Sequence, residues 1–182
     1  AKLIITTSKY SVSYLNNMFP NLKKKIFKVN LSVDSNKFKI KKKSNLITYM
    51  PRKLPEHSNL LLFYLKNLLP KNWKILPLIN VSEKKIIKSL SISKIFLSFS
   101  NFEGLGIPPI EAAFSGNKVI GYIGGGGSEY WKKPIFIKIE NGEIGDFGKK
   151  IIQNIKDYNL SWIKQTEKQR RNLSKIYSNE LE

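Results

Sequence analysis

The chain has 182 residues, 41% of them hydrophobic, which is enough for one well-packed domain and short for two. It has no cysteine and one histidine, His57, so a disulfide framework, a thiolate metal site and a multi-histidine metal site are excluded within it. Its formal net charge is +19, nearly all from lysine, and its longest apolar stretches are far too short to span a membrane.

The excess of lysine has two interpretations. Together with the many Asn and Ile residues, it is typical of the amino-acid bias of an AT-rich genome, and we favour this cause. A basic face would also hold a protein against an anionic membrane surface, so we expect a cytoplasmic protein with peripheral attachment to the inner face of the membrane as the open alternative. No nucleic-acid partner is expected, because the lysine clusters at residues 23–25 and 41–43 lack the arginine forks and interleaved aromatics of such sites.

Short apolar runs alternate with amphipathic stretches, which predicts alternating strands and helices. The predicted strands are residues 3–7, 25–31, 45–50, 74–79, 95–99, 118–122 and 134–139. The predicted helices are residues 8–19, 59–69, 83–90, 108–114, 147–158 and 161–177. The alternation from residue 45 to residue 158 is typical of an α/β fold with a Rossmann-like, doubly wound parallel sheet.

Two cations follow the predicted strand at residues 45–50. Arg52 and Lys53 lie at its carboxyl end, which is the edge where open parallel sheets bind ligands. An exposed basic turn would give the same sequence, but these cations stand at a strand end and not in a run of charge. We therefore predict that they bind an anionic ligand. His57, just before the next predicted helix, is expected to be a surface or capping residue.

The most specific stretch is residues 95–131. Gly104 and Gly106 interrupt the strand that begins at residue 95, so residues 101–106 are expected to be irregular. Pro108 and Pro109 fit the first turn of the following helix, which Gly116 would terminate. The backbone amides of residues 104–107 would then lie at the positive end of a helix, where a phosphate is the usual ligand.

Two carboxylates flank this predicted phosphate site. Glu103 precedes the helix and Glu111 lies in its first turns, so both can face the mouth of one crevice. Two acids beside a phosphate make sense as acceptors for sugar hydroxyls on either side of a diphosphate, which is the layout of a nucleotide-sugar. Glycines 124–127 follow the next strand, and we expect Gly126 and Gly127 to line the site, although a flexible structural loop would have the same sequence.

The sequence Glu103-Gly-Leu-Gly-Ile-Pro-Pro-Ile-Glu111, followed by Gly126-Gly127-Ser-Glu, resembles the E-x7-E signature of retaining glycosyltransferases of the GT-B fold, family 4 (glycosyltransferase group 1). The resemblance implies the C-terminal, donor-binding half of a GT-B fold. It implies that Glu103 binds hydroxyls of the donor sugar and that Glu111 binds those of the ribose. Arg52 and Lys53 would neutralise the departing nucleoside diphosphate. Family members usually have glycine before this arginine, whereas this chain has Pro51.

By this resemblance the site has a catalytic group and a donor-binding group. The catalytic residues are Glu103, Arg52 and Lys53. The donor-binding residues are Glu111, Gly104, Leu105, Gly106, Ile107, Gly126 and Gly127. No metal and no cofactor is implied, since the nucleotide-sugar is itself the substrate. The implied partners are a nucleotide-diphosphate sugar and a glycan or lipid-linked acceptor.

The resemblance also divides the chain into three segments. Residues 1–44 would be a remnant of the N-terminal acceptor domain with the interdomain linker, residues 45–160 the nucleotide-sugar-binding domain, and residues 161–182 the C-terminal crossing helix. The chain is then expected to be a fragment that is inactive alone. Basic residues on the last helix would instead suit membrane attachment. They are Lys164, Lys168, Arg170 and Arg171.

The expected function is transfer of a sugar from a nucleotide-sugar to an acceptor in glycan or polysaccharide biosynthesis, with retention of configuration. One alternative is a non-catalytic subunit that binds a nucleotide-sugar and needs a partner. The other is a basic module that binds nucleic acid or membranes.

Overall fold

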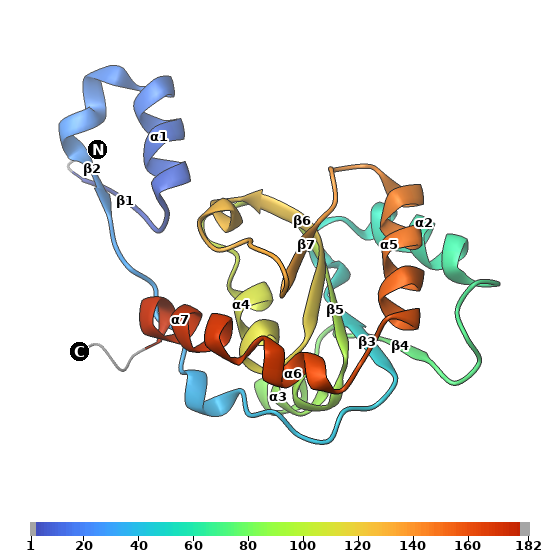
Figure 1. The fold of residues 1–182 in the computed structure, drawn as a ribbon. Helices are drawn as coiled ribbons and strands as arrows, with labels where there is room; N and C mark the ends of the chain where they lie inside the picture. The colour runs from blue at the N-terminus through green and yellow to red at the C-terminus, as the bar shows by residue number, and fades with distance from the viewer. Residues whose placement is uncertain (1–2, 179–182) are drawn as a thin grey trace.

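The computed structural model describes residues 3–178 and shows a five-stranded parallel sheet with helices on both faces (Figure 1). The strand order is β4-β3-β5-β6-β7, and every neighbouring pair is parallel. The chain therefore moves outward from β3 to β4, crosses back to β5 and continues in the opposite direction. The strands are β3 (Leu46–Tyr49), β4 (Lys74–Pro77), β5 (Ile95–Glu103), β6 (Lys118–Gly125) and β7 (Phe136–Lys138). The predicted doubly wound α/β sheet is confirmed.

Two hydrophobic cores lie on the two faces of this sheet. Alternate residues of β5 point to opposite faces, so Ile95 and Leu97 pack with α2 and α5, whereas Phe96 packs with α3 and α4. The terminal helices α6 and α7 cover the same face as α3 and α4 (Figure 1). The helices are α2 (Pro55–Leu65), α3 (Glu83–Ile92), α4 (Ile107–Phe114), α5 (Ile144–Lys156), α6 (Ser161–Gln165) and α7 (Glu167–Tyr177).

A small lobe precedes the sheet domain and lies beside the carboxyl ends of its strands (Figure 1). It contains a parallel pair of short strands with a helix between them, as the sequence predicted. A segment with one 3₁₀ turn, η2 (Ser35–Lys37), connects the lobe to β3. The lobe consists of β1 (Ile4–Thr6), α1 (Lys9–Met18), the 3₁₀ turn η1 (Pro20–Lys25) and β2 (Ile26–Lys28). The predicted segments 1–44 and 161–182 extend over residues 1–2 and 179–182, which lie outside the described residues.

Strand β5 continues further than the sequence predicted. It runs to Glu103, so the expectation of irregular backbone from residue 101 is wrong for residues 101–103. The strand keeps pairing with β6 across a register shift between Ser100 and Glu103, and Glu103 pairs with Gly125. The glycines of β6 permit this close pairing, because a Cβ on Gly124 would lie 2.7 Å from the Cβ of Ser100.

The predicted helix 161–177 is two helices, α6 and α7, which meet at Thr166. The Thr166 hydroxyl donates to the Trp162 carbonyl at 2.8 Å, and the Arg170 guanidinium donates to the Ile163 carbonyl. The bond from Arg170 gives the Ile163 carbonyl a side-chain donor at the break, and the Trp162 carbonyl also accepts from the Thr166 amide at 3.0 Å. Arg170 is only 9% exposed, so its expected place on a basic membrane-facing surface is wrong.

Two predicted helix starts also differ from the structure. Helix α2 begins at Pro55 and not at residue 59, because proline is favoured in a first turn and the Ser58 hydroxyl bonds the Pro55 carbonyl there. Helix α5 begins at Ile144, so Asp146 lies within its first turn and does not cap it. Helix α3 begins at Glu83, as predicted, and is capped by Ser82, whose hydroxyl accepts from the Lys85 amide.

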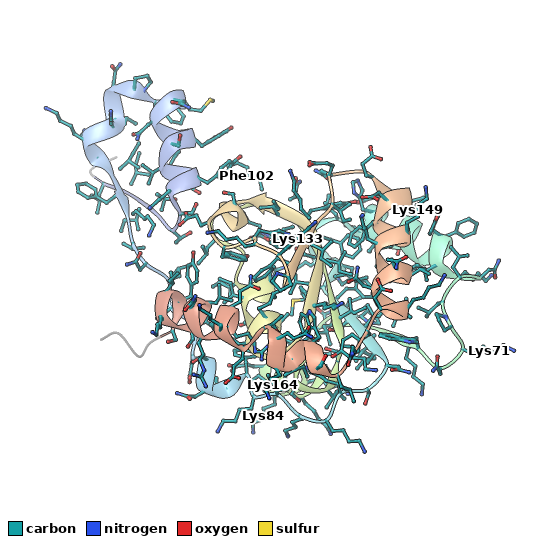
Figure 2. The ribbon with its side chains drawn as sticks, viewed as in Figure 1. Lys71, Lys84, Phe102, Lys133, Lys149 and Lys164 are labelled. Atoms are coloured by element: carbon teal, nitrogen blue, oxygen red, sulfur yellow. The ribbon has the colours of Figure 1, made fainter. Side chains whose placement is uncertain are left out.

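The labelled lysines in Figure 2 lie on separate elements around the sheet domain. They are Lys71 in the α2–β4 connection, Lys84 on α3, Lys133 before β7, Lys149 on α5 and Lys164 on α6. In the described part of the chain, no helix is both long enough and apolar enough to cross a membrane.

Candidate functional site

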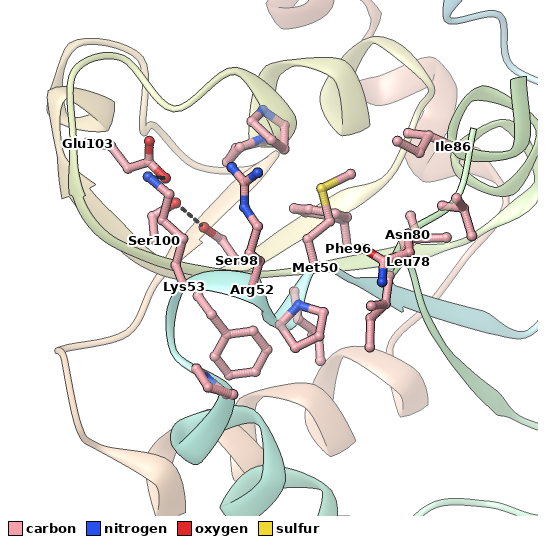
Figure 3. Close-up of a pocket in the computed structure, with 18 residues that line it drawn as sticks. Met50, Arg52, Lys53, Leu78, Asn80, Ile86, Phe96, Ser98, Ser100 and Glu103 are labelled. Atoms are coloured by element: carbon pink, nitrogen blue, oxygen red, sulfur yellow. Dashed lines mark hydrogen bonds and ion pairs between the residues drawn. The ribbon is translucent and has the colours of Figure 1, made fainter. Parts of the chain in front are cut away.

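A cavity of about 630 Å³ opens at the carboxyl ends of β3 and β5 (Figure 3). These two strands are neighbours from which the chain continues in opposite directions, and ligands of open parallel sheets bind at such a reversal. The volume is in the usual range of small-molecule sites. The lining residues are Met50, Pro51, Arg52, Lys53, Pro55, Leu78, Ile79, Asn80, Val81, Ile86, Phe96, Leu97, Ser98, Phe99, Ser100, Glu103, Pro108 and Pro109.

Charged side chains gather at one end of the cavity. Arg52 and Lys53 come from the 3₁₀ turn η3 (Pro51–Lys53), directly after β3, and Glu103 is the last residue of β5. The Lys53 Nζ atom lies 2.8 Å from the Glu103 Oε1 atom, and the two side chains are 39% and 20% exposed. The sequence placed Arg52 and Lys53 at a strand end and Glu103 in the turn after the next strand but one, and the structure brings the three together because β3 and β5 end at the same edge of the sheet.

Apolar side chains form the other end of the cavity. Met50, Leu78, Ile86 and Phe96 line it, together with the loop that follows β4. Within this loop Asn80 has a φ of 49°, a left-handed conformation that Asn adopts more readily than most residues. Figure 3 shows Glu103 and Lys53 at one end, Leu78, Asn80 and Ile86 at the other, and Arg52 between them. The cavity therefore changes from charged to apolar along its length.

Two buried hydroxyls of β5, which the sequence analysis did not single out, also line the cavity. The Ser98 hydroxyl donates to the Tyr122 carbonyl at 2.9 Å and lies 3.1 Å from the Ser100 hydroxyl (Figure 3). The signal was present in the sequence, because Ser98 and Ser100 alternate with apolar residues in an otherwise apolar strand.

The turn between β5 and α4 forms the rim of the cavity. Gly106 is the N-cap of α4, has a φ of 80°, and accepts a 2.6 Å hydrogen bond on its carbonyl from the Tyr130 hydroxyl. Burial raises the Tyr130 pKa well above its usual value, so this hydroxyl keeps its proton. Pro108 and Pro109 lie in the first turn of α4, as predicted, and line the cavity.

The other predicted residues of this turn do not belong to the cavity wall. Gly104, Leu105, Gly106 and Ile107 are not among the lining residues, and the Leu105 side chain is buried in the core. Among the hydrogen bonds described for residues 3–178, none uses the amide of Leu105 or Gly106 as a donor. Of the amides predicted to bind a phosphate, these two lie at the N-terminus of α4 and donate to no protein acceptor among the described hydrogen bonds.

Glu111 lies apart from Glu103. It is half-buried on α4, outside the cavity wall, near the ion pair that Lys37 and Glu83 form at 3.0 Å. Burial raises the pKa of Glu111, the negative charge of Glu83 raises it further, and Lys37 opposes both effects. The structure therefore brings Arg52, Lys53 and Glu103 together in one cavity and leaves Glu111 beside it.

Gly126 and Gly127 lie in the buried 3₁₀ turn η4 (Gly126–Glu129), behind the Gly104 turn. A Cβ on Gly126 would lie 1.7 Å from the Gly104 carbonyl oxygen, so glycine is required for this close approach. Neither glycine lines the cavity. Gly126 packs against the Gly104 turn, and Gly127 follows it in the same 3₁₀ turn. Direct donor binding by either glycine stays a prediction.

The N-terminal lobe contacts the same two turns, which the sequence analysis missed. The Lys9 amide, in the first turn of α1, donates to the Glu129 carboxylate at 2.5 Å. The rings of Tyr10 and Tyr14 pack on Phe102, with centroid distances of 6.1 and 5.1 Å, and Figure 2 shows Phe102 at the end of β5 facing α1. The lobe therefore packs directly on η4 and on the end of β5, next to the turn at the rim of the cavity.

His57 is not a surface or capping residue, and that expectation is wrong. Because α2 begins at Pro55, His57 lies within its first turn and faces the sheet. Its Nδ1 atom lies 3.1 Å from the hydroxyl of the buried Tyr122, and the two rings are nearly perpendicular. His57 does not line the cavity.

Comparison with known proteins gives structural matches only. No protein-family model matches the chain, and no curated protein matches it. TarM of S. aureus in complex with UDP has a TM-score of 0.74 at 19% identity, over 97% of this chain and 41% of TarM. Anabaena Alr3699/HepE in complex with UDP and glucose has a TM-score of 0.76 at 13% identity, over 98% of this chain and 60% of HepE. A glycosyltransferase from Rickettsia africae has a TM-score of 0.71 at 16% identity, over 97% of this chain and 59% of that one.

These neighbours are glycosyltransferases of the GT-B fold. The five-stranded parallel sheet with helices on both faces is the Rossmann-like half of that fold, as the sequence predicted. The chain spans between 41% and 60% of the length of these three neighbours.

Proposed function

We propose that this chain is the donor-binding half of a glycosyltransferase and that its cavity binds a nucleotide-diphosphate sugar. The observation that carries the proposal is the polarity of the cavity, which is apolar at Leu78 and Ile86 and charged at Glu103, with Arg52 between. A nucleotide-sugar has the same order of base, diphosphate and sugar. Neither the nucleoside alone nor the sugar alone would match both the apolar end and the charged end of the cavity.

Each part of the ligand has a matching part of the cavity. The loop after β4, residues 78–81, would pack against the base. Arg52 and Lys53 would bind the diphosphate, since guanidinium and ammonium groups are the usual partners of phosphate oxygens. Glu103 would accept hydrogen bonds from hydroxyls of the sugar. In this assignment the unpaired amides at the N-terminus of α4 face the phosphate or the sugar.

Glu111 completes the E-x7-E signature and, in this proposal, accepts hydrogen bonds from the ribose hydroxyls. Because it lies outside the cavity wall, the ribose would have to extend over the first turn of α4, past Pro108. Gly126 and Gly127 contribute by holding the Gly104 turn in place. With this signature the proposed enzyme belongs to the retaining family 4 group.

The reaction breaks the bond between the anomeric carbon of the sugar and an oxygen of the diphosphate. A glycosidic bond forms to the hydroxyl oxygen of the acceptor, and the diphosphate leaves with the bonding electron pair as an added negative charge. The proton of the acceptor hydroxyl passes to the departing phosphate oxygen, from which it exchanges with water. Fixed cations beside the leaving oxygen lower the barrier, typically by a few kcal/mol. In this proposal Arg52 and Lys53 take this role, so no metal ion is assigned. The acceptor class is a glycan or a lipid-linked glycan.

The solved neighbours support the choice of ligand. TarM and HepE were solved with UDP, and the catalytic domain of starch synthase IV from Arabidopsis thaliana was solved with ADP and acarbose. The bases of these nucleotides differ, so the neighbours do not favour one base for the donor.

Calorimetry of the chain with UDP-glucose, GDP-mannose, ADP-glucose and dTDP-glucose tests the proposal. We expect micromolar binding of at least one of them and a loss of about tenfold or more in Arg52→Ala, since one charge-assisted contact is worth about that much. Arg171→Ala is the matched control, because Arg171 is exposed on α7, outside the cavity wall, and pairs with Glu167 at 2.6 Å. Absence of binding to all four ligands by a folded chain would overturn the proposal.

The two alternatives give different results in the same samples. A non-catalytic donor-binding subunit would bind a nucleotide-sugar but neither hydrolyse nor transfer it unless a separate partner protein supplies the acceptor site. A basic module for nucleic acid or membranes would show binding that falls steeply with salt and that Arg52→Ala and Arg171→Ala weaken equally.

A further inference from the structure

Two serine hydroxyls of β5 form a short hydrogen-bonded chain that ends in the cavity. The Ser98 Oγ atom lies 2.9 Å from the Tyr122 carbonyl oxygen and 3.1 Å from the Ser100 Oγ atom. Ser98 is 2% exposed and Ser100 is 9% exposed, and both line the cavity. Figure 3 shows Ser100 on the side of Glu103 and Lys53, with Ser98 next to it.

The direction of this chain follows from counting protons. A carbonyl oxygen only accepts, so the single proton of Ser98 is used in the bond to Tyr122. The bond between the two serines must then use the proton of Ser100. Ser100 therefore has no proton left for a ligand, whereas its oxygen still has a free lone pair.

A hydroxyl in this state distinguishes between the parts of a nucleotide-sugar. Phosphate oxygens are acceptors and offer no proton at neutral pH, so they gain no hydrogen bond from Ser100. Sugar hydroxyls and the amide of an acylamino sugar carry protons and can donate to it. In the described part of the chain, the Ser100 hydroxyl has no hydrogen-bonded protein partner other than the Ser98 hydroxyl.

We propose that Ser100 is a specificity-determining residue that accepts a hydrogen bond from an O–H or N–H group of the donor sugar, and that Ser98 fixes it as an acceptor. This inference rests on the proposed function and adds the chemistry of one contact. A site built to hydrogen-bond a substrate hydroxyl discriminates strongly against the analogue that lacks it, because the buried acceptor is then left unpaired. Ser100 would thus select sugars that bear a proton donor at one position.

Comparing two ligands in Ser100→Ala tests the contact. The ligands are the nucleotide-sugar that the wild-type chain binds best among UDP-glucose, GDP-mannose, ADP-glucose and dTDP-glucose, and the corresponding free nucleoside diphosphate. We expect the Kd of the nucleotide-sugar to rise about tenfold and that of the nucleoside diphosphate to change less than about twofold. The control is Ser91→Ala, which removes another buried hydroxyl, bonded to the Lys88 carbonyl on α3, and should change neither value.

Ser98→Ala tests the direction of the chain. Without Ser98 the proton of Ser100 is free to turn into the cavity, so Ser98→Ala should weaken nucleotide-sugar binding less than Ser100→Ala does. The double variant should bind like Ser100→Ala alone, because Ser98 acts only through Ser100. A purely structural role of Ser98 would instead give losses that add.

Monodeoxy analogues of the same nucleotide-sugar identify the donor group. One of them should bind the wild type about tenfold more weakly than the parent ligand but bind Ser100→Ala as well as the parent does. Equal losses for nucleotide-sugar and nucleoside diphosphate in Ser100→Ala, or no loss for either, would overturn this inference and leave the proposed function intact. Failure of the wild type to bind any of these nucleotides would overturn both.

Discussion

The Lys53 ammonium and the Glu103 carboxylate form an ion pair, with the nitrogen 2.8 Å from the nearer oxygen. Lys53 follows β3 and Glu103 ends β5, so the pair joins two neighbouring strands at the edge where the cavity opens. In the proposed function each of these groups has a different ligand to bind, the diphosphate and the sugar. Their mutual attraction therefore competes with the ligand for both groups.

Substitutions of the two residues of this pair should change the affinity for a nucleoside diphosphate in opposite directions. Lys53→Met removes a cation from the diphosphate site, and we expect the Kd of the free nucleoside diphosphate to rise about tenfold. Glu103→Gln frees Lys53 from its partner and removes a negative charge near the phosphates, so the same Kd should fall by about twofold. Calorimetry of both variants with one nucleoside diphosphate checks the prediction. Weaker binding in Glu103→Gln as well would contradict it.

Gly126 should tolerate no side chain. A Cβ there would lie 1.7 Å from the Gly104 carbonyl oxygen, and backbone cannot move away cheaply. We expect Gly126→Ala to lower the free energy of unfolding by about 2 kcal/mol or more and to weaken nucleotide-sugar binding through a displaced Gly104 turn. The measurement is urea denaturation followed by calorimetry.

Gly145 supplies the matched control for that substitution. It lies in the first turn of α5, and an added Cβ would meet nothing within 4 Å. Gly145→Ala should leave binding unchanged and raise the free energy of unfolding by up to about 1 kcal/mol, because alanine is the better helix former. If Gly126→Ala were as well tolerated as Gly145→Ala, the packing of η4 on the Gly104 turn would be refuted.

Glu129 should hold the N-terminal lobe in place. Its carboxylate accepts from the Lys9 amide at the N-terminus of α1, a position where a negative charge is also favoured by the helix dipole. We expect Glu129→Ala to destabilise α1 by about 0.5–2 kcal/mol, measured as faster amide hydrogen exchange in residues 4–18. Glu140→Ala is the control, because Glu140 is exposed and pairs with Lys138, far from α1 in sequence and in contacts. Unchanged exchange in α1 would show that Glu129 does not anchor the lobe.

Lys43 should make stability depend on pH. Burial and, to a smaller extent, the nearby Arg170 together lower the pKa of Lys43 from 10.5 to about 7, while its Nζ atom donates to the carbonyl of Ser115 at 2.5 Å. Between pH 7 and 10.5 the unfolded chain binds more protons at this residue than the folded one. The free energy of unfolding should therefore rise with pH in this window, by up to about 1.4 kcal/mol per pH unit.

Comparison with Lys43→Met isolates this effect. The free energy of unfolding of the wild type minus that of Lys43→Met should increase from pH 7 to pH 9 in urea titrations, since methionine does not titrate. Lys42→Met removes one charge at an exposed neighbouring position and controls for the change in net charge. A difference that stays constant with pH for Lys43→Met would refute a lowered pKa.

Local features of the site could be predicted from sequence because they depend on neighbouring residues. Proline in the first turn of α4, Gly116 with a φ of 77° after its end and the Ser82 cap of α3 each follow from the conformational limits of one or two residues. The clustering of Arg52 with Glu103 could also be predicted, since parallel strands carry their carboxyl ends to the same edge.

The length of β5 and the contact made by His57 could not be predicted in this way, because residues distant in sequence determine them. Pairing of Glu103 with Gly125 extends β5, and His57 faces Tyr122 because α2 lies against the sheet. The contact of Lys9 with Glu129 joins residues separated by 120 positions, which no local pattern encodes.

The sequence by itself determined the kind of sheet, the order of its elements and the chemical groups at its ligand edge, because hydrophobic period and backbone limits are local properties. Only the tertiary structure decided that Lys53 pairs with Glu103, that Glu111 lies beside Lys37 and Glu83 outside the cavity, and that Ser98 donates to Tyr122. Each of these depends on which strands and helices are neighbours and in what register. Burial of both faces of the whole sheet fixes these neighbours and their register. The neighbours and register in turn fix the hydrogen-bond partners in the cavity.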